Sequence, residues 1–221
     1  MSAPPILRRA ELRDAGGLAA LFGDTAMLPF TTIAPFTSVA YWEKRLGEYA
    51  DPSHLPLIAT EGDSIIGLIL LRGFPNHIRR KHCASIDLLA VRVDCRRKGV
   101  GRALVDATIS AADSWLQMRR IEVMVSTPST ALKHFYSSFG FVEEGIKRLE
   151  TFRATRYVDS TVMSRISVGI MPAPTSPALP ASKRPRKSLP LKIAVRPATE
   201  DDASAFARVF SDRSASNGTL Q

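Results

Sequence analysis

The fold class is decided by a stretch that reads Val91-Arg92-Val93-Asp94-Cys95-Arg96-Arg97-Lys98-Gly99-Val100-Gly101-Arg102-Ala103-Leu104. A segment rich in Ile, Leu and Val leads into it, a basic turn with two glycines occupies its middle, and apolar residues at helical spacing follow it. The pattern predicts a strand, a tight turn and the start of a long helix.

The basic turn has the features of an anion site. Successive backbone N–H groups in such a turn form a concavity for an anion, and the following helix N-terminus adds partial positive charge. Glycine lets the backbone approach a phosphate closely. Neither the dinucleotide fingerprint G-x-G-x-x-G at a first strand nor a Walker sequence is present. We therefore predict a phosphate-binding turn that belongs to neither of these two motifs. The alternative is that the segment is an ordinary glycine-containing loop whose basic side chains face solvent.

The segments around this turn alternate between strand and helix patterns, as in an α/β (α+β) domain. Strands are predicted at residues 6–9, 55–60, 65–71, 83–93, 121–126, 142–149 and 157–166. Helices are predicted at residues 14–22, 39–49, 100–118 and 131–139. In the third helix, the buried stripe is expected to consist of Leu104, Ala107, Ala111 and Trp115.

Two further segments follow this domain, which we place at residues 1–167. Residues 168–190 hold six of the fifteen prolines and read as an extended linker. Aligned at an offset of 188, Leu7 to Asp24 and Val195 to Asp212 agree at seven of eighteen positions. Residues 191–221 are therefore predicted to be the truncated start of a second copy, either a fragment of a tandem protein or a decayed repeat; chance similarity is the alternative.

Composition narrows the class of protein. Cys83 and Cys95 are too few for a disulfide framework and lack metal-ligand spacing, so they are expected to be small buried apolar residues. No apolar run is long enough to cross a membrane and no signal peptide is visible, so a cytoplasmic protein is expected.

The net charge of +9 raises the question of an anionic partner. More than half of the excess lies between Val168 and Lys192, which contains five basic residues and no acidic one. Because no aromatic residues interleave with these charges, the segment makes a poor nucleic-acid site. An anionic small molecule suits the remaining charge better.

A second signal lies about 35 residues beyond the turn, where Tyr136 in a predicted helix is followed by Gly140 and Phe141. A tyrosine near a helix end, followed by Gly-Phe and a strand, is weakly informative alone, since Tyr136 could be a half-buried aromatic with a wet hydroxyl. Its separation from the phosphate turn makes the combination specific.

Together these motifs make residues 5–167 resemble the GNAT N-acetyltransferases. The acetyl-CoA motif of that family, Arg/Gln-x-x-Gly-x-Gly/Ala after the fourth strand, is matched by Arg96, Gly99 and Gly101. Its later Tyr-x-x-x-Gly-Phe pattern is matched by Tyr136, Gly140 and Phe141. Within that family, the chain looks most similar to the bacterial L-amino-acid N-acetyltransferases. The residues that carry this similarity are Trp115-Leu116, residues 120–123, Gly145 and residues 157–159.

The resemblance implies a fold and a set of site residues. The fold would be a mixed, mostly antiparallel sheet of about seven strands flanked by helices, with the fourth and fifth strands splayed apart around acetyl-CoA. Tyr136 would serve the departing thiolate. The residues expected at the cofactor are Val91, Val93, Arg96, Arg97, Lys98, Gly99, Val100, Gly101, Arg102 and Ser129. Many relatives have Asn where this chain has Ser129, which has a shorter reach.

The implied reaction is direct transfer of acetyl from acetyl-CoA to an amine in a ternary complex. The general base stays open: Asp87 and Glu122 lie on the two central strands, and structural ion pairs are favoured over catalysis for both. His134 is expected to be solvated. A small amine such as an amino acid is the favoured acceptor; protein N-termini or lysines, and a non-catalytic acyl-CoA-binding module, are the alternatives. A homodimer is left open, and no metal is expected.

Overall fold

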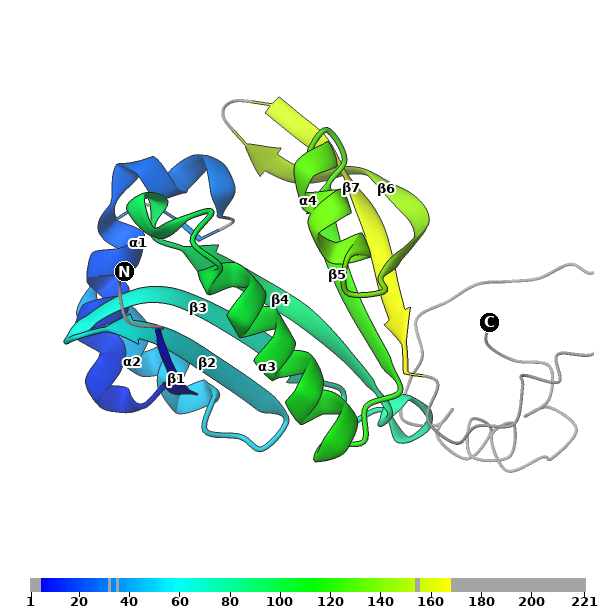
Figure 1. Cartoon of the computed structure of the whole chain (residues 1–221), viewed down its shortest axis with the longest axis horizontal. Helices are drawn as coiled ribbons and strands as arrows, with labels where there is room; N and C mark the ends of the chain where they lie inside the picture. Colours follow the sequence, from blue (N-terminus) through cyan, green and yellow to red (C-terminus); the bar gives the residue numbers. More distant parts are fainter. Residues whose placement is uncertain (1–4, 32, 35, 154–155, 168–221) are drawn as a thin grey trace, which may run out of the picture. The chain divides into compact units, whose positions relative to one another are not determined.

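A central sheet of seven strands forms the framework of the domain in the computed structural model (Figure 1). The structure describes residues 5–31, 33–34, 36–153 and 156–167. In chain order the strands are β1 (Ile6–Arg9), β2 (His54–Glu61), β3 (Ser64–Gly73), β4 (Cys83–Val91), β5 (Arg120–Ser126), β6 (Val142–Arg153) and β7 (Arg156–Ile166). Their order across the sheet is β1-β2-β3-β4-β5-β7-β6. All neighbours are antiparallel except β4 and β5, which confirms the predicted fold class.

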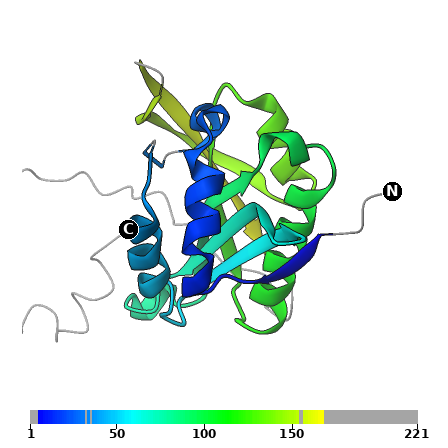
Figure 2. The ribbon, with the colours of Figure 1, turned by 90° about the vertical axis from the view of Figure 1, so that its left-hand side faces the viewer.

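Helices cover both faces of this sheet (Figure 2). The α-helices are α1 (Ala15–Gly23), α2 (Val39–Glu48), α3 (Val100–Ser114) and α4 (Thr130–Ser137), and the short 3₁₀ helices are η1 (Leu12–Asp14), η2 (Thr25–Phe30), η3 (Ile78–Arg80) and η4 (Val93–Cys95). One apolar cluster joins α1 and α2 to a face of β2 and β3 around Trp42 and Phe22. A second cluster joins α3 and α4 to the other face around Leu104 and Phe141.

A bulge in β4 prepares the opening of the sheet. Leu71 of β3 pairs with Ile86 and Leu70 pairs with Leu88, so Asp87 is the extra residue of the bulge. Beyond it, β4 and β5 no longer pair: their register covers only residues 83–86 and 120–123, although β4 continues to Val91 and β5 to Ser126. This confirms the expected splay between the fourth and fifth strands, which is visible in Figure 1.

Several predicted boundaries are wrong: the sixth strand continues past residue 149 to Arg153, the fourth helix ends at Ser137 and not at Phe139, and two further boundaries also differ. The fourth strand ends at Val91 and not at Val93, because Cys95 donates a backbone hydrogen bond of 2.9 Å to the Arg92 carbonyl and closes the turn of η4. The third helix ends at Ser114 and not at Met118, because Leu116 donates to Ala111 and Gln117 has a positive φ of 51°.

The earlier helix end also overturns part of the predicted apolar stripe. The buried residues of α3 are Val100, Leu104, Val105, Thr108 and Ala112, so the stripe runs beside the expected one. Trp115, expected at its end, leaves the helix axis and is 83% exposed.

The proposed linker at residues 168–190 and the second copy at residues 191–221 lie outside the described residues. Among the helices that the structure describes, none is long and apolar enough to cross a membrane.

Candidate active site

Where β4 and β5 separate, the backbone groups that face each other across the gap no longer form hydrogen bonds between the two strands. Residues 88–91 of β4 still pair with β3 on one side, but β5 no longer supplies a ladder on the other. Backbone N–H and C=O groups along such an edge are obligatory hydrogen-bonding groups. An extended ligand with amide groups can pair with this edge as an additional strand would.

The predicted phosphate turn follows directly from this edge. Arg97 and Gly99 have positive φ values of 61° and 88°, which turns the chain from η4 into α3. Within the described part of the chain, none of the backbone N–H groups of residues 97–102 donates a hydrogen bond, and Gly99 at the helix N-cap offers no side chain. Six successive N–H groups without a partner at a helix N-terminus are the arrangement that an anion site requires, and the phosphate-binding role of the turn stays a prediction.

Gly101 lies where the turn approaches both halves of the sheet. A Cβ atom at this position would lie 3.6 Å from Cγ2 of Val91, at the end of β4, and 3.8 Å from Cζ of Phe135, in α4. The first turn of α3 is therefore packed between the two elements that border the splay. Glycine keeps the backbone of this turn accessible there.

The arginine side chains of the turn do not all point to the anion site. Arg96 donates from Nε to the Val91 carbonyl at 3.0 Å and from Nη2 to the sulfur of the buried Met27 at 3.3 Å. Burial lowers the pKa of the Arg96 guanidinium. Arg97 and Lys98 are exposed and extend the basic character of the turn to solvent.

Arg102, the last residue of the predicted phosphate turn, contacts α4. Its Nη2 donates to the hydroxyl of Ser138 at 2.9 Å, and its guanidinium lies 4.7 Å from the centre of the Phe139 ring. Its backbone N–H still belongs to the free donors of the turn. Arg102 therefore keeps its main-chain N–H available to an anion, whereas the Arg96 N–H is already bonded to the Val93 carbonyl at 3.3 Å; both arginines use their side chains to fix neighbouring elements.

The other predicted cofactor residues have different surroundings. Val91 ends β4, whereas Val93 lies in η4, where its carbonyl accepts from the Arg96 N–H at 3.3 Å. The strand edge expected to reach Val93 therefore stops two residues earlier. Ser129 is the half-buried N-cap of α4 and makes no side-chain capping bond.

Tyr136 lies on the buried side of α4. It is 4% exposed and contacts the rings of Phe135 and Phe141 edge-on, at centroid distances of 5.2 and 5.4 Å. Burial raises the pKa of Tyr136 well above its ordinary value of 10. Among the described residues, no group forms a hydrogen bond with its hydroxyl. Its hydroxyl is therefore available to donate a hydrogen bond to a bound ligand.

Both carboxylates considered as bases are held by arginines. Asp87, the bulge residue, pairs with Arg72 of β3. Glu122 accepts from Arg120 at 2.8 Å and lies 3.5 Å from Arg80 of η3. The ion-pair interpretation favoured from the sequence is confirmed for both, and the structure identifies no general base. His134 is exposed, as expected.

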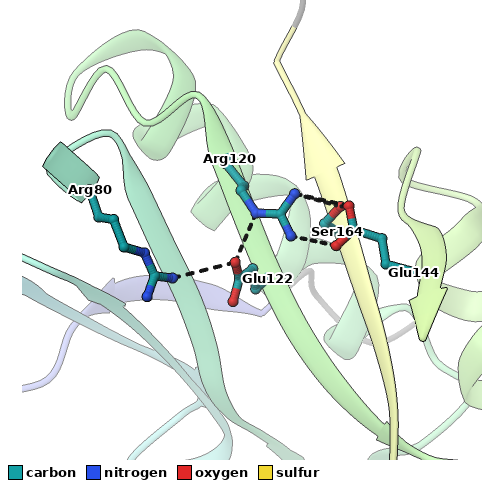
Figure 3. A network of polar contacts seen from close by, with 5 residues as sticks. All are labelled: Arg80, Arg120, Glu122, Glu144 and Ser164. Carbon is teal, nitrogen blue, oxygen red and sulfur yellow. Dashed lines mark hydrogen bonds and ion pairs between the residues drawn. The ribbon is translucent and has the colours of Figure 1, made fainter. Parts of the chain in front are cut away.

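Glu122 belongs to a polar network where β4 and β5 are still paired (Figure 3). Arg120 contacts Glu122 on its own strand and both carboxylate oxygens of Glu144 in β6, and Ser164 of β7 also contacts Glu144. Asp113 of α3 and Arg165 of β7 form a two-pronged ion pair at 2.9 and 2.8 Å. We call the group formed by Arg80, Arg120, Glu122, Glu144 and Ser164 the closed-end network; the Asp113–Arg165 pair is separate from it, because Arg165 follows Ser164 on β7 and points to the opposite face of the sheet.

Sequence reasoning missed the closed-end network as well as Met27, Ser138 and Phe139. These residues meet only through the order of strands and helices in space. One local signal was available: Arg120 and Glu122 are two residues apart on one strand, so they share a face.

Comparisons with known proteins agree with this geometry. A profile described as the acetyltransferase (GNAT) family matches residues 22–141. The L-amino acid N-acetyltransferase AaaT of Escherichia coli (strain K12) is 28% identical over 163 residues, which cover 73% of this chain and 97% of that protein.

Solved structures share the fold at lower identity. The ribosomal-protein-S5-alanine acetyltransferase of Vibrio fischeri is 17% identical with a TM-score of 0.69, over 78% of this chain and 98% of that chain. The spermidine N-acetyltransferase of Vibrio cholerae, solved with CoA and spermine, is 22% identical with a TM-score of 0.65, over 74% of this chain and 95% of that chain.

Proposed function

Because the chain belongs to the GNAT family of acetyltransferases, we propose that it transfers the acetyl group of acetyl-CoA to a primary amine of a small molecule such as an L-amino acid. One observation carries the proposal: among the residues that the structure describes, six backbone N–H groups without a partner follow an unpaired strand edge, and a buried tyrosine whose hydroxyl has no partner lies in the neighbouring helix. Together these features suit the pyrophosphate, the pantetheine amides and the thioester of one ligand.

The cofactor would be held mainly by the main chain. The N–H groups of residues 97–102 bind the pyrophosphate oxygens, and Arg97 and Lys98 add positive charge. The free edge of β4, up to Val91, pairs with the amides of the pantetheine arm. Ser129 at the start of α4 contributes a shorter polar side chain than the asparagine of many relatives.

The reaction joins the amine nitrogen to the thioester carbon and breaks the carbon–sulfur bond. The proton lost by the amine ends on the coenzyme A sulfur, through solvent, since the described residues show no free carboxylate at the centre of the sheet. Because burial raises the pKa of Tyr136, its hydroxyl stays protonated at neutral pH and donates a hydrogen bond to the departing sulfur. Main-chain N–H groups near the end of β4 stabilise the oxyanion.

An amino acid is proposed as the acceptor because the Escherichia coli relative, which this chain matches over 97% of its length, is named for L-amino acids. The acyl group is proposed to be acetyl because that relative is an N-acetyltransferase. Transfer to protein N-termini is the second candidate, favoured by the fold similarity to a ribosomal-protein-S5-alanine acetyltransferase. A cytoplasmic location stays a prediction.

An acceptor screen tests the proposal. Thiol release from acetyl-CoA is measured with the twenty L-amino acids, spermidine and short peptides with an N-terminal alanine. We expect kcat/KM for the best amino acid to exceed that for the best peptide or polyamine by at least about tenfold, which corresponds to ~1.4 kcal/mol of transition-state binding. A preference for peptides would move the function to protein acetylation. If the protein binds CoA but acetylates none of these amines, it would instead be a non-catalytic acyl-CoA-binding module.

A further inference from the structure

Besides their shared apolar cluster, the two helices that border the proposed cofactor site are linked by the side chain of one arginine. Arg102, in the first turn of α3, donates to the Ser138 hydroxyl at 2.9 Å and covers the Phe139 ring at 4.7 Å. The Ser138 hydroxyl in turn donates to the Phe135 carbonyl at 2.7 Å. This chain of contacts runs from the phosphate turn to the last turn of α4, where Tyr136 lies.

The position of this link matters because the proposed ligand is held at two ends. The free N–H groups of residues 97–102 would hold its pyrophosphate, and the hydroxyl of Tyr136 would meet its sulfur. Since β4 and β5 stop pairing after residues 86 and 123, the sheet itself no longer fixes the spacing between α3 and α4 at this level. Contacts between the helices do so instead: the shared apolar cluster and the polar link through Arg102.

We propose that Arg102 is a positioning residue, whose side chain sets the distance and angle between the phosphate turn and Tyr136 and transmits cofactor binding to α4. The proposal rests on the function proposed above. Its side chain acts through Ser138 and Phe139, while its backbone N–H remains part of the anion site. A residue of this kind affects the rate more than the affinity, because a displacement of about 1 Å at a reacting group can cost up to ~100-fold in rate.

Steady-state kinetics with the full chain tests the positioning role. Arg102→Ala is expected to lower kcat roughly tenfold and to change the KM for acetyl-CoA less than about threefold. Ser138→Ala, a smaller change at the same link, should lower kcat in the same direction. The double variant should be no slower than Arg102→Ala alone, because both substitutions break one contact. Arg79→Ala, which removes an exposed arginine of η3, is the matched control and should change neither parameter.

A second measurement does not depend on turnover. Amide hydrogen exchange of the peptide covering α4 is followed with and without saturating CoA. We expect CoA to slow this exchange in wild type and in Arg79→Ala, and to slow it at least about threefold less in Arg102→Ala and Ser138→Ala.

The outcomes separate the two proposals. A raised KM or CoA dissociation constant with unchanged kcat in Arg102→Ala would make its side chain a phosphate ligand and overturn the positioning role. Equal protection of α4 by CoA in wild type and Arg102→Ala would also overturn it. If wild type binds CoA and acetylates no amine, the proposed function fails, and the exchange experiment still decides the role of Arg102.

Discussion

Burial gives Tyr136 its chemical character. A phenol in water has a pKa near 10, and the apolar surroundings of Tyr136 raise its pKa further. A thiol has a pKa near 8.5, so complete proton transfer from this phenol to a thiolate is uphill. The structure therefore favours a hydrogen bond from Tyr136 to the departing sulfur over full protonation by the tyrosine.

Tyr136→Phe removes this hydrogen bond and keeps the ring contacts with Phe135 and Phe141. We expect kcat to fall roughly 10²-fold with little change in the KM for acetyl-CoA, because the interaction forms as charge develops on the sulfur. Steady-state kinetics at neutral pH measures both. Tyr157→Phe, which changes a tyrosine that is 64% exposed, is the control and should behave as wild type. An unchanged kcat in Tyr136→Phe would return the residue to a packing role.

Gly101 tests the contribution of the phosphate turn. An added Cβ meets Val91 and Phe135 at ordinary contact distances, so Gly101→Ala should fold and bind CoA with a modest loss. The two methyl groups of Gly101→Val extend beyond that contact, and we expect CoA affinity to fall at least about tenfold, or ~1.4 kcal/mol. Isothermal titration compares the variants. Gly47→Val, where the added atoms enter open space in α2, is the control. Equal affinities of wild type and Gly101→Val would remove this turn from the cofactor site.

At this scale, sequence reasoning predicts the backbone well where the pattern is local. Gly99 and Gly101 belong to one continuous strand–turn–helix segment, so their spacing alone predicts an anion site. The side-chain roles of Arg96 and Arg102 could not be predicted, because their partners Met27 and Ser138 lie 69 and 36 residues away in the chain. From the sequence alone, every arginine in a basic turn is a candidate phosphate ligand. The partners of each guanidinium become known only from the fold.

At the scale of elements, the strands and helices were predictable because each has a clear period, whereas their ends depend on tertiary contacts. The stripe of α3 continues from Leu104 through Thr108 and Ala112 in place of Ala107 and Ala111, and Trp115 was counted as part of a helix that ends at Ser114. The bulge at Asp87 has no sequence signature, yet it marks where β4 parts from β5. The splay entered the prediction through family resemblance alone.

The closed-end network makes stability depend on pH through Glu144. Hydrogen bonds from Arg120 and Ser164 lower the pKa of Glu144 to about 2, from an ordinary value of 4.5. A carboxyl whose pKa is lowered by folding stabilises the protein above its unfolded pKa. This contribution is lost as the pH falls from about 4.5 towards 2.

We therefore expect Glu144→Gln to lower the thermal midpoint at pH 7, and the difference from wild type to shrink as the pH is lowered through 4. Thermal unfolding followed by circular dichroism at several pH values measures it. Glu150→Gln, which changes a weaker pair with Lys147 at 3.7 Å, is the control and should have a smaller effect. A difference for Glu144→Gln that stays constant from pH 7 to pH 3 would contradict the role of its charge.

At the scale of the whole molecule, the sheet spans residues 6–166, and the buried residues of both apolar clusters lie within residues 10–163. The Escherichia coli relative matches over a similar length of 163 residues. The last described residue is also tied to the domain, because Ser167 donates a backbone hydrogen bond of 2.9 Å to the Arg119 carbonyl. The activity should therefore lie within residues 1–167.

A chain that ends at Ser167 tests this directly. We expect it to retain kcat, and to keep the thermal midpoint within about 3 °C of the full chain, since a change of 1 kcal/mol shifts the midpoint of a domain of this size by ~2–4 °C. A chain that ends at Thr161 is the contrasting variant: it removes Met163 from the core and Arg165 from its ion pair with Asp113, so it should fail to fold. If the chain ending at Ser167 instead loses activity or several degrees of stability, residues 168–221 are an integral part of the enzyme. The proposed truncated second copy would then have to be given up, because a mere remnant has no stabilising role in the first domain.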